Sequence, residues 1–169
     1  MTFSGAKVIH PKTIKPLHNK NIPMQVRSFV DHSEQGTVIS SVTSEGKKTP
    51  VFIKKENQIM ISILPKDLSF VMGENLAGVF HCFEQYGVKV NMVQAGAVSI
   101  DVCADDERSR IEKVIRELGR EYRILYNEGA EMLTIRHYQP ESEKQITKDA
   151  EILISQRTRT SARYVVRRK

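Results

Sequence analysis

The sequence predicts an α+β fold made of two ferredoxin-like βαββαβ modules, each an antiparallel sheet with helices on one face. Three observations support this prediction. Strand-like and helix-like segments alternate in the order β-α-β-β-α-β between residues 58 and 127, and the same order begins again near residue 131. The third is a pair of strand-like segments ahead of the first module that lack partners there. We therefore expect the first module to be inserted into the second.

The first module is expected at residues 58–129. Its helical segment 75–87 places Leu76, Val79, Phe80 and Phe83 at i, i+3, i+4 and i+7, which predicts one apolar helix face. Gly87 is a typical helix stop. A second amphipathic helix is expected to begin after Asp105 or Asp106 as N-cap and to run to about Gly119. The expected strands are 58–64, 89–95, 97–104 and 122–127.

The second module begins with a strand at 131–138 and a short helix at 139–151, followed by strands at 152–158 and 161–169. It lacks its final helix and strand. We expect the strands at 22–29 and 37–40 to complete its sheet, so that residues 22–50 and 130–169 form one discontinuous module. Residues 41–50 are small, polar and charged, which predicts a linker.

Composition indicates a globular chain: 40% of the 169 residues are hydrophobic and 27% are charged. No apolar run approaches the ~20 residues that a membrane span needs, and the N-terminus shows no signal-peptide pattern. Cys82 and Cys103 lie in apolar segments, which favours reduced core thiols over a disulfide. We expect a cytoplasmic protein. The five histidines show no metal-ligand spacing, so no metal site is predicted.

The net charge of +6 is concentrated in residues 157–169, which carry six basic residues and no acid. A protein that binds a nucleic-acid backbone usually spreads its charge over a folded face, so this pattern argues against that function class. Three interpretations stay open. The arginines could form a nucleic-acid- or anion-binding patch, a charged edge strand that blocks pairing, or a contact with an acidic surface of another domain, and the last two are favoured.

Three segments carry a resemblance to a known family. GAKVIHPKTIKPL (5–17), IPMQVRSF (22–29) and GTVIS (36–40) resemble the junction between the kinase and regulatory domains of aspartate kinases. FEQYGVKVNMVQAGAVSIDV (83–102) is similar to the first ACT domain of that family, and EGAEMLTIRHY (128–138) to the start of the second. The resemblance implies that residues 1–21 end the kinase-domain junction. It also implies a regulatory region that binds an end-product amino acid and so controls aspartate phosphorylation.

In this family the effector lies between two sheets joined side by side, held by the loop after the first strand and by the second strand. A helix start suits the effector's carboxylate, while side-chain amides and strand-edge carbonyls suit its ammonium. The implied effector-binding residues are Ser69, Phe70, Met72, Gly73, Asn75, Leu76, Val90, Asn91, Met92 and Gln94. Two alternatives stay open: Asn75 as an ordinary N-cap, and Asn91 and Gln94 as partners of a neighbouring strand.

The identity of the effector stays open between threonine and lysine. Asn91 stands where the lysine-sensing pattern has an acid, and Gly96-Ala97 stand where it has Ser-Glu. The implied partners are the free amino acid, a second copy of the chain paired through its sheets, and the kinase domain of the parent enzyme. We expect no membrane or nucleic-acid partner.

The sequence contains no Lys-Phe-Gly-Gly-type motif and no Gly-rich phosphate-binding loop. We therefore expect no phosphoryl transfer from this chain alone and no cofactor in it, since ATP and Mg would belong to the kinase domain. Met1 could be a natural start, which would suit a stand-alone regulatory subunit acting in trans. A βαββαβ nucleic-acid-binding module is a further alternative, disfavoured because no strand is rich in aromatic residues.

Overall fold

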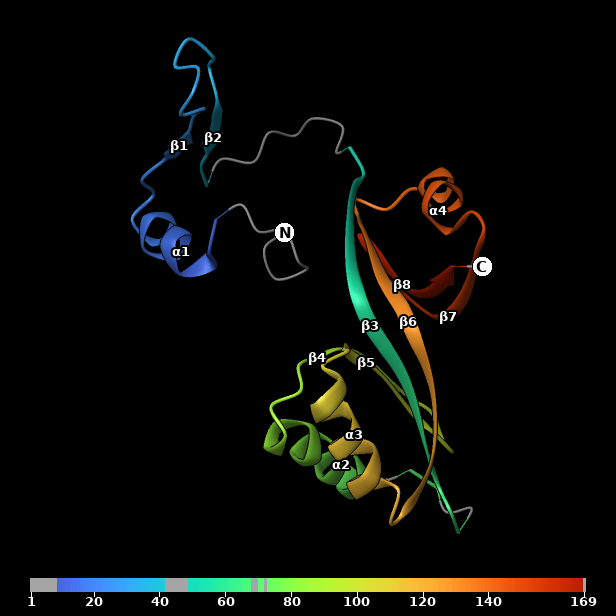
Figure 1. Cartoon of the computed structure of the whole chain (residues 1–169). Coiled ribbons are helices and arrows are strands. Elements are labelled where there is room, and N and C mark those ends of the chain that lie inside the picture. Colours follow the sequence, from blue (N-terminus) through green and yellow to red (C-terminus); the bar gives the residue numbers. More distant parts are fainter. Residues whose placement is uncertain (1–8, 42–48, 68–69, 72, 169) are drawn as a thin grey trace. The chain divides into compact units, whose positions relative to one another are not determined.

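The computed structural model describes residues 9–41, 49–67, 70–71 and 73–168 (Figure 1). The chain divides into two compact units, Met1–Thr49 and Pro50–Lys169. Within the described residues, no helix is long and apolar enough to cross a membrane.

The N-terminal unit contains helix α1 (Pro11–Asn19) and strands β1 (Met24–Val26) and β2 (Thr37–Ile39). Pro11 stands in the first turn, where proline is tolerated, and the Nδ1 atom of His10 accepts a hydrogen bond from the Lys12 amide at 3.2 Å. The strands pair antiparallel, with Gln25 opposite Val38. Gly36 has φ +70°, and a Cβ there would lie 2.3 Å from the Val26 carbonyl oxygen, so only glycine fits.

This pairing corrects one prediction. The strands at 22–29 and 37–40 were expected to complete the sheet of the second module, but β1 and β2 pair with each other in a two-stranded sheet of their own. Their shortness explains the error, since two three-residue strands connected by residues 27–36 can satisfy each other's hydrogen bonds locally. The strand that completes the sheet of the second module must therefore come from another part of the chain.

In its described residues, the second unit consists of one six-stranded antiparallel sheet with the strand order β4-β5-β3-β6-β8-β7 and of three helices. Its elements are β3 (Val51–Pro65), α2 (Gly73–Gln85), β4 (Val90–Ala95), β5 (Ile100–Asp105), α3 (Arg108–Leu118), β6 (Tyr122–Arg136), α4 (Pro140–Thr147), β7 (Ala150–Arg157) and β8 (Ser161–Arg168). The predicted strands and helices of residues 58–127 are all present in the predicted order.

Strands β3 and β6 are each 15 residues long and run through both modules (Figure 1). Residues 58–65 of β3 pair with β5 and with the start of β6, whereas residues 51–55 pair with 132–136 of β6. The second sheet is thus completed by residues 51–55. We call residues 58–129 the first module, and residues 51–55 with 130–168 the second module. This part of the strand was not predicted, because residues 54–57 are polar. In the structure the register between β3 and β6 shifts there, at a bulge.

Each module has a core of its own on its helix-covered face. In the first module, α2 and α3 pack on β3 and β5 around Phe83, Val79 and Ile61, all at most 1% exposed. In the second, α4 lies over Leu133, Ile135 and Val166. A fully buried side chain of this size contributes about 1.5–3 kcal/mol. Phe80 was predicted on the buried face of α2 but is 43% exposed. The buried face of α2 is formed by Val79, Cys82 and Phe83, and Phe80 lies at its border.

A third cluster lies on the sheet face away from the helices and joins the two modules. Its residues come from all six strands of the sheet: Met60, Met92, Cys103, Ala130, Met132, Ile154 and Val165. Methionine packs adaptably, so this shared cluster is softer than a core of branched residues. Both cysteines are free and buried, as predicted. Burial raises the pKa of the Cys82 thiol and raises that of Cys103 to about 12.

The arginine-rich end of the chain forms β8, which lies between β6 and β7. The edge-strand interpretation is therefore wrong for residues 161–168. Arg167 pairs with Glu151 at 2.7 Å, and Arg168 pairs with Glu131 at 3.3 Å. Arg168 also donates to the carbonyl of Lys148 at 2.9 Å, just after the C-terminus of α4, where a helix dipole favours positive charge.

The different burial of the two phenylalanines of α2 can be tested. Phe83→Ala should lower the free energy of unfolding by about 3–5 kcal/mol, because it leaves a cavity between α2 and the sheet. Phe80→Ala, the matched control, should cost about 1 kcal/mol or less. Urea unfolding of both variants measures the difference, and equal losses would contradict the packing described.

Candidate functional site

The predicted effector-binding residues lie on two elements of the first module. Phe70, Gly73, Asn75 and Leu76 lie at or just before the start of α2. Val90, Asn91, Met92 and Gln94 lie on β4, which is an edge strand of the sheet. Ser69 and Met72 fall outside the described residues.

The start of α2 meets the turn that follows β4. The Val71 amide donates to the Ala97 carbonyl at 2.8 Å, and the Gly96 amide donates to the Ser99 carbonyl at 2.9 Å inside the turn. Val71 and Leu76 pack on the same helix-side core as Val90. These contacts form a corner in which the first turn of a 13-residue helix stands beside an open strand edge. We call the α2 start, the turn at 96–99 and the β4 edge the α2–β4 corner.

Phe70 and Asn75 differ in their surroundings. The Phe70 ring is 68% exposed at this corner. Asn75 lies inside α2, so the N-cap alternative is wrong. Its Nδ2 atom donates to the Tyr122 hydroxyl at 3.2 Å, which ties the first turn of the helix to the start of β6. Gly73 begins the helix, and a Cβ there would meet no atom within 4 Å, so its small size leaves open space beside the helix start.

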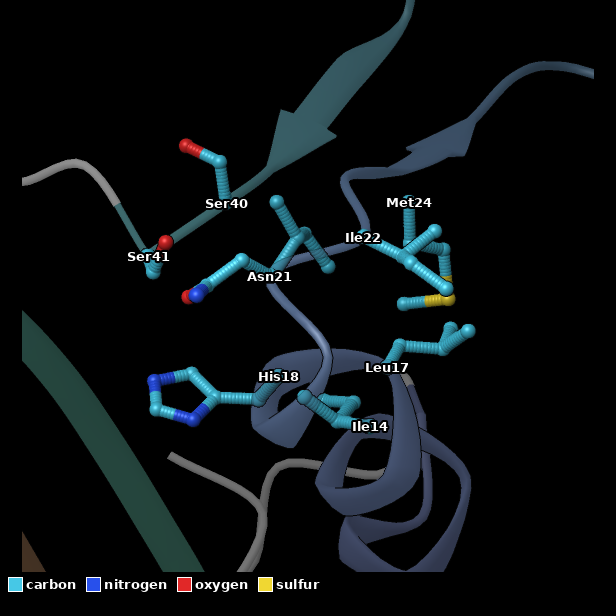
Figure 2. A pocket seen from close by; sticks show the side chains of 9 residues that line it. Ile14, Leu17, His18, Asn21, Ile22, Met24, Ser40 and Ser41 are labelled. Atoms are coloured by element: carbon cyan, nitrogen blue, oxygen red, sulfur yellow. The ribbon is translucent and has the colours of Figure 1, made fainter.

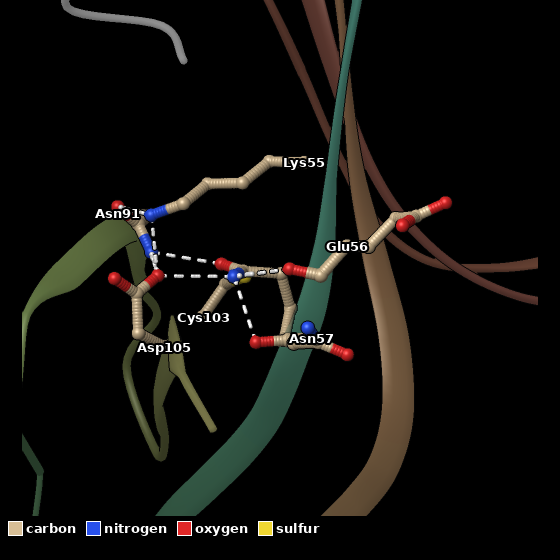
Figure 3. A network of polar contacts seen from close by, with 7 residues as sticks. Lys55, Glu56, Asn57, Asn91, Cys103 and Asp105 are labelled. Carbon is tan, nitrogen blue, oxygen red and sulfur yellow. Dashed lines mark hydrogen bonds and ion pairs between the residues drawn. The ribbon is translucent and has the colours of Figure 1, made fainter. Parts of the chain in front are cut away.

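Asn91 belongs to a polar network (Figure 3), which lies on the sheet face of Met60 and Cys103, away from the helices. Its Nδ2 atom donates to Gln58 Oε1 at 2.8 Å and to Asp105 Oδ1 at 2.6 Å. Its Oδ1 atom accepts from Lys55 Nζ at 3.0 Å. Asn91 sits at a bulge of β4, where the register shifts between Val90 and Met92. The alternative in which Asn91 serves a neighbouring strand is the one that the structure supports.

Asp105 is the anion of this network. Lys55 forms an ion pair with its Oδ1 atom, and Gln58, only 1% exposed, donates to the same oxygen at 3.0 Å. Burial opposes ionisation of Asp105, but the hydrogen bonds from Lys55, Gln58 and Asn91 outweigh it and hold the pKa of Asp105 below its ordinary value. Lys55 belongs to the second module and Asp105 to the first, so this ion pair bridges the modules.

Sequence reasoning missed the role of Asp105, which was predicted as a helix N-cap. The residue at the N-cap of α3 is Glu107, and its side chain makes no capping bond. The strand period carried the missing signal: Asp101, Cys103 and Asp105 alternate on one face of β5, opposite Ser62, Met60 and Gln58 of β3. Asp101 likewise accepts a hydrogen bond from Ser62, at 2.6 Å.

The two remaining effector-binding candidates of β4, Met92 and Gln94, lie in different surroundings. Met92 is buried in the cluster shared by the modules, whereas Gln94 is exposed opposite Asp101. The structure therefore brings Phe70, Gly73, Leu76 and Val90 to the α2–β4 corner, and it places Asn91 and Met92 beneath the sheet. No pattern had pointed to Gln156 of β7, whose Nε2 atom donates to the carbonyl of Val93 on β4 at 2.5 Å.

Two cavities lie elsewhere in the described part of the chain. One, in the N-terminal unit, is lined by Ile14, Leu17 and Met24 among others (Figure 2). Its volume of about 20 Å³ has room for about one water molecule. The other is an open groove of about 280 Å³ between α3 and β6, lined by Arg108, Arg116 and Tyr126 among others. Neither includes a predicted effector residue. Among the described residues, no group of three or more His, Cys, Asp or Glu is placed to hold a metal ion.

The chain resembles known proteins in sequence. No protein-family model matches the chain. It is 30% identical to aspartokinase 3, chloroplastic, of Arabidopsis thaliana over 130 residues, which cover 71% of this chain and 23% of the relative. The chain is a relative of the aspartokinases. It spans about a quarter of the length of the plant aspartokinases that it matches.

Solved structures place this aspartokinase relative in the same fold as the regulatory part of those enzymes. Escherichia coli aspartokinase III, solved with lysine and aspartate, matches with a TM-score of 0.76 at 19% identity over 99% of this chain and 40% of that one. A putative C-terminal regulatory domain of aspartate kinase from Porphyromonas gingivalis W83 matches with a TM-score of 0.58 at 14% identity. That match covers 70% of this chain and 86% of the other, so the shared fold is that of the regulatory region.

The Asp105 network makes a pH-dependent contribution to stability. Because the pKa of Asp105 is lowered on folding, its stabilisation is fully present above the unfolded value of 3.8 and is lost as the pH falls through the lower folded value. Asp105→Asn should cost about 1–3 kcal/mol at pH 7, where it removes a charged hydrogen-bond acceptor, and clearly less at pH 3.

Denaturant unfolding at the two pH values measures this effect. Asp149→Asn, at an exposed turn with φ +58° that asparagine also tolerates, is the control. An Asp105→Asn loss that stays the same at pH 3 and pH 7 would contradict the assigned role of the carboxylate.

Proposed function

We propose that this chain is an amino-acid-sensing regulatory region of an aspartokinase, with two ACT domains that correspond to the first and second modules, the first inserted into the second. Binding of an end-product amino acid, threonine or lysine, would control the phosphorylation of aspartate. The observation that carries the proposal is the α2–β4 corner, where a helix start and an open strand edge stand side by side in a fold shared with aspartokinase regulatory regions.

The corner offers complementary groups to a free amino acid. The start of α2 presents the backbone amides of its first turn, and the helix dipole favours a carboxylate there. The edge of β4 offers backbone carbonyls to an ammonium group. The exposed Phe70 ring would cover the aliphatic part of the ligand. A second copy of the chain that extends the sheet at β4 would close the site from the other side, as expected for a homodimer.

Two observations favour threonine over lysine as the first ligand to test. The side chain of Asn91 is neutral and is held by Gln58 and Asp105. At the turn of the α2–β4 corner, Gly96 and Ala97 stand where the lysine-sensing pattern has Ser-Glu. These residues offer no carboxylate to a lysine side chain, and threonine needs none.

The region could act on a kinase domain in the same chain or in a separate subunit. The Porphyromonas gingivalis domain is described as a regulatory domain of aspartate kinase, and 86% of it is covered by this fold. Its description as a C-terminal domain of the enzyme supports action on a kinase domain in the same chain. Whether the kinase domain is in the same chain or in a separate subunit, the ligand must bind one conformation of the modules more tightly than another, because only differential affinity shifts a conformational equilibrium.

A thermal-shift titration of the full chain tests the proposed function. Threonine or lysine at 100 times its Kd should raise the free energy of unfolding by about 2.7 kcal/mol, with a Tm that rises with ligand concentration. Phe70→Ala should weaken binding about tenfold, since it removes apolar contact with the ligand. It should leave the Tm of the free protein unchanged, because the ring is exposed.

Phe29→Ala, which removes a ring in the N-terminal unit that is even more exposed than that of Phe70, is the matched control and should bind like the wild type. Methionine serves as a second amino acid of similar size. The proposal fails if neither threonine nor lysine changes the Tm at millimolar concentration.

A further inference from the structure

The two modules of the second unit are separate bodies joined by a soft contact. Each has its own helix-side core, one around Phe83 and the other around Ile135, with no residue in common. What they share is the cluster on the other face of the sheet, in which three of seven residues are methionines. Unbranched, flexible side chains repack at low cost. The shared cluster, which is the core that spans both modules, therefore resists their relative motion less than a core of branched side chains would.

Only two strands connect the modules, and both are irregular at the same level. On β3 the register shifts between Lys55 and Gln58, and Asn57 has φ +54°. On β6, Gly129 has φ +66° beside Ala130, the partner of Gln58. Bulges and left-handed residues bend a strand and weaken its ladder locally. The crossing from 56 to 58 and from 128 to 130 thus has the features of a two-strand hinge.

Polar contacts of two residues of the second module, Lys55 and Gln156, hold the modules together. Lys55 forms an ion pair with Asp105 and donates to Asn91 Oδ1 at 3.0 Å. Gln156 of β7 donates a hydrogen bond to the Val93 carbonyl of β4. Strands β4 and β7 stand at opposite edges of the sheet order, so this hydrogen bond forms only because the sheet folds back on itself. These contacts depend on the closed arrangement.

The Gln156 contact falls on the edge that the effector would use. A carboxamide N–H and an ammonium N–H are donors to the same kind of acceptor, a strand-edge carbonyl. We propose that Gln156 is an internal competitor for the effector at the β4 edge, and that the modules part about the 56–58 and 128–130 crossing when the effector displaces it. This inference rests on the proposed function, because it places the effector at the α2–β4 corner.

The test combines a distance measurement with a binding measurement in the full chain. Spin labels on Glu84→Cys of α2 and Lys144→Cys of α4, both exposed, report the separation of the modules. The native thiols are buried with raised pKa values, so labelling goes to the introduced cysteines. Gln156→Leu removes the amide, and Ser155→Ala, at the neighbouring exposed position of β7, is the matched control.

Gln156→Leu should lengthen or broaden the label distance without ligand and tighten threonine or lysine binding roughly two- to tenfold, the range of one net hydrogen bond. Saturating effector should lengthen the distance in the wild type to the same value. If Gln156→Leu leaves both distance and affinity like Ser155→Ala, the inference is overturned. If the wild type binds no amino acid, the proposed function fails. The Gln156→Leu distance then still decides whether this contact closes the modules.

Discussion

The sharing of β3 and β6 between two modules is the constraint on which the rest of this structure depends. Each strand is 15 residues long, and each contributes one part to a sheet covered by α2 and α3 and another part to a sheet covered by α4. Strands of that length twist strongly, so the two sheet regions turn their uncovered faces toward each other. The methionine-containing cluster and the ion pair between Lys55 and Asp105 both follow from that turn.

The first module was well predicted from sequence because its signals are local. The alternation in 97–104 and the i, i+3, i+4 spacing of α3 can each be recognised in a window of a few residues. The strand β5 and the helix α3 both lie within three residues of their expected bounds. The strand that completes the second sheet could not be recognised from a local pattern. Residues 54–57 read as a polar interruption, and only the pairing of Lys54 with Leu133 and of Lys55 with Met132 shows that the strand continues through them.

The candidate site was predicted in part for a related reason. The resemblance placed the α2 start and β4 side by side, and the Val71–Ala97 hydrogen bond joins them. It could not decide which way the side chains of β4 point, because the bulge between Val90 and Met92 resets the alternation there. Asn91 consequently turns away from the corner, toward Asp105 and Gln58. Gln156 was out of reach because its contact depends on the folding back of the whole sheet.

The continuity of β3 has an evolutionary consequence. Two domains that meet only through a linker can be exchanged one at a time by recombination, but here residues 51–65 serve both modules within a single strand. A breakpoint anywhere inside that strand would deprive one sheet of its ladder, and an insertion there would shift the side-chain register of both. The two modules are therefore bound to be inherited, and to diverge, as one piece.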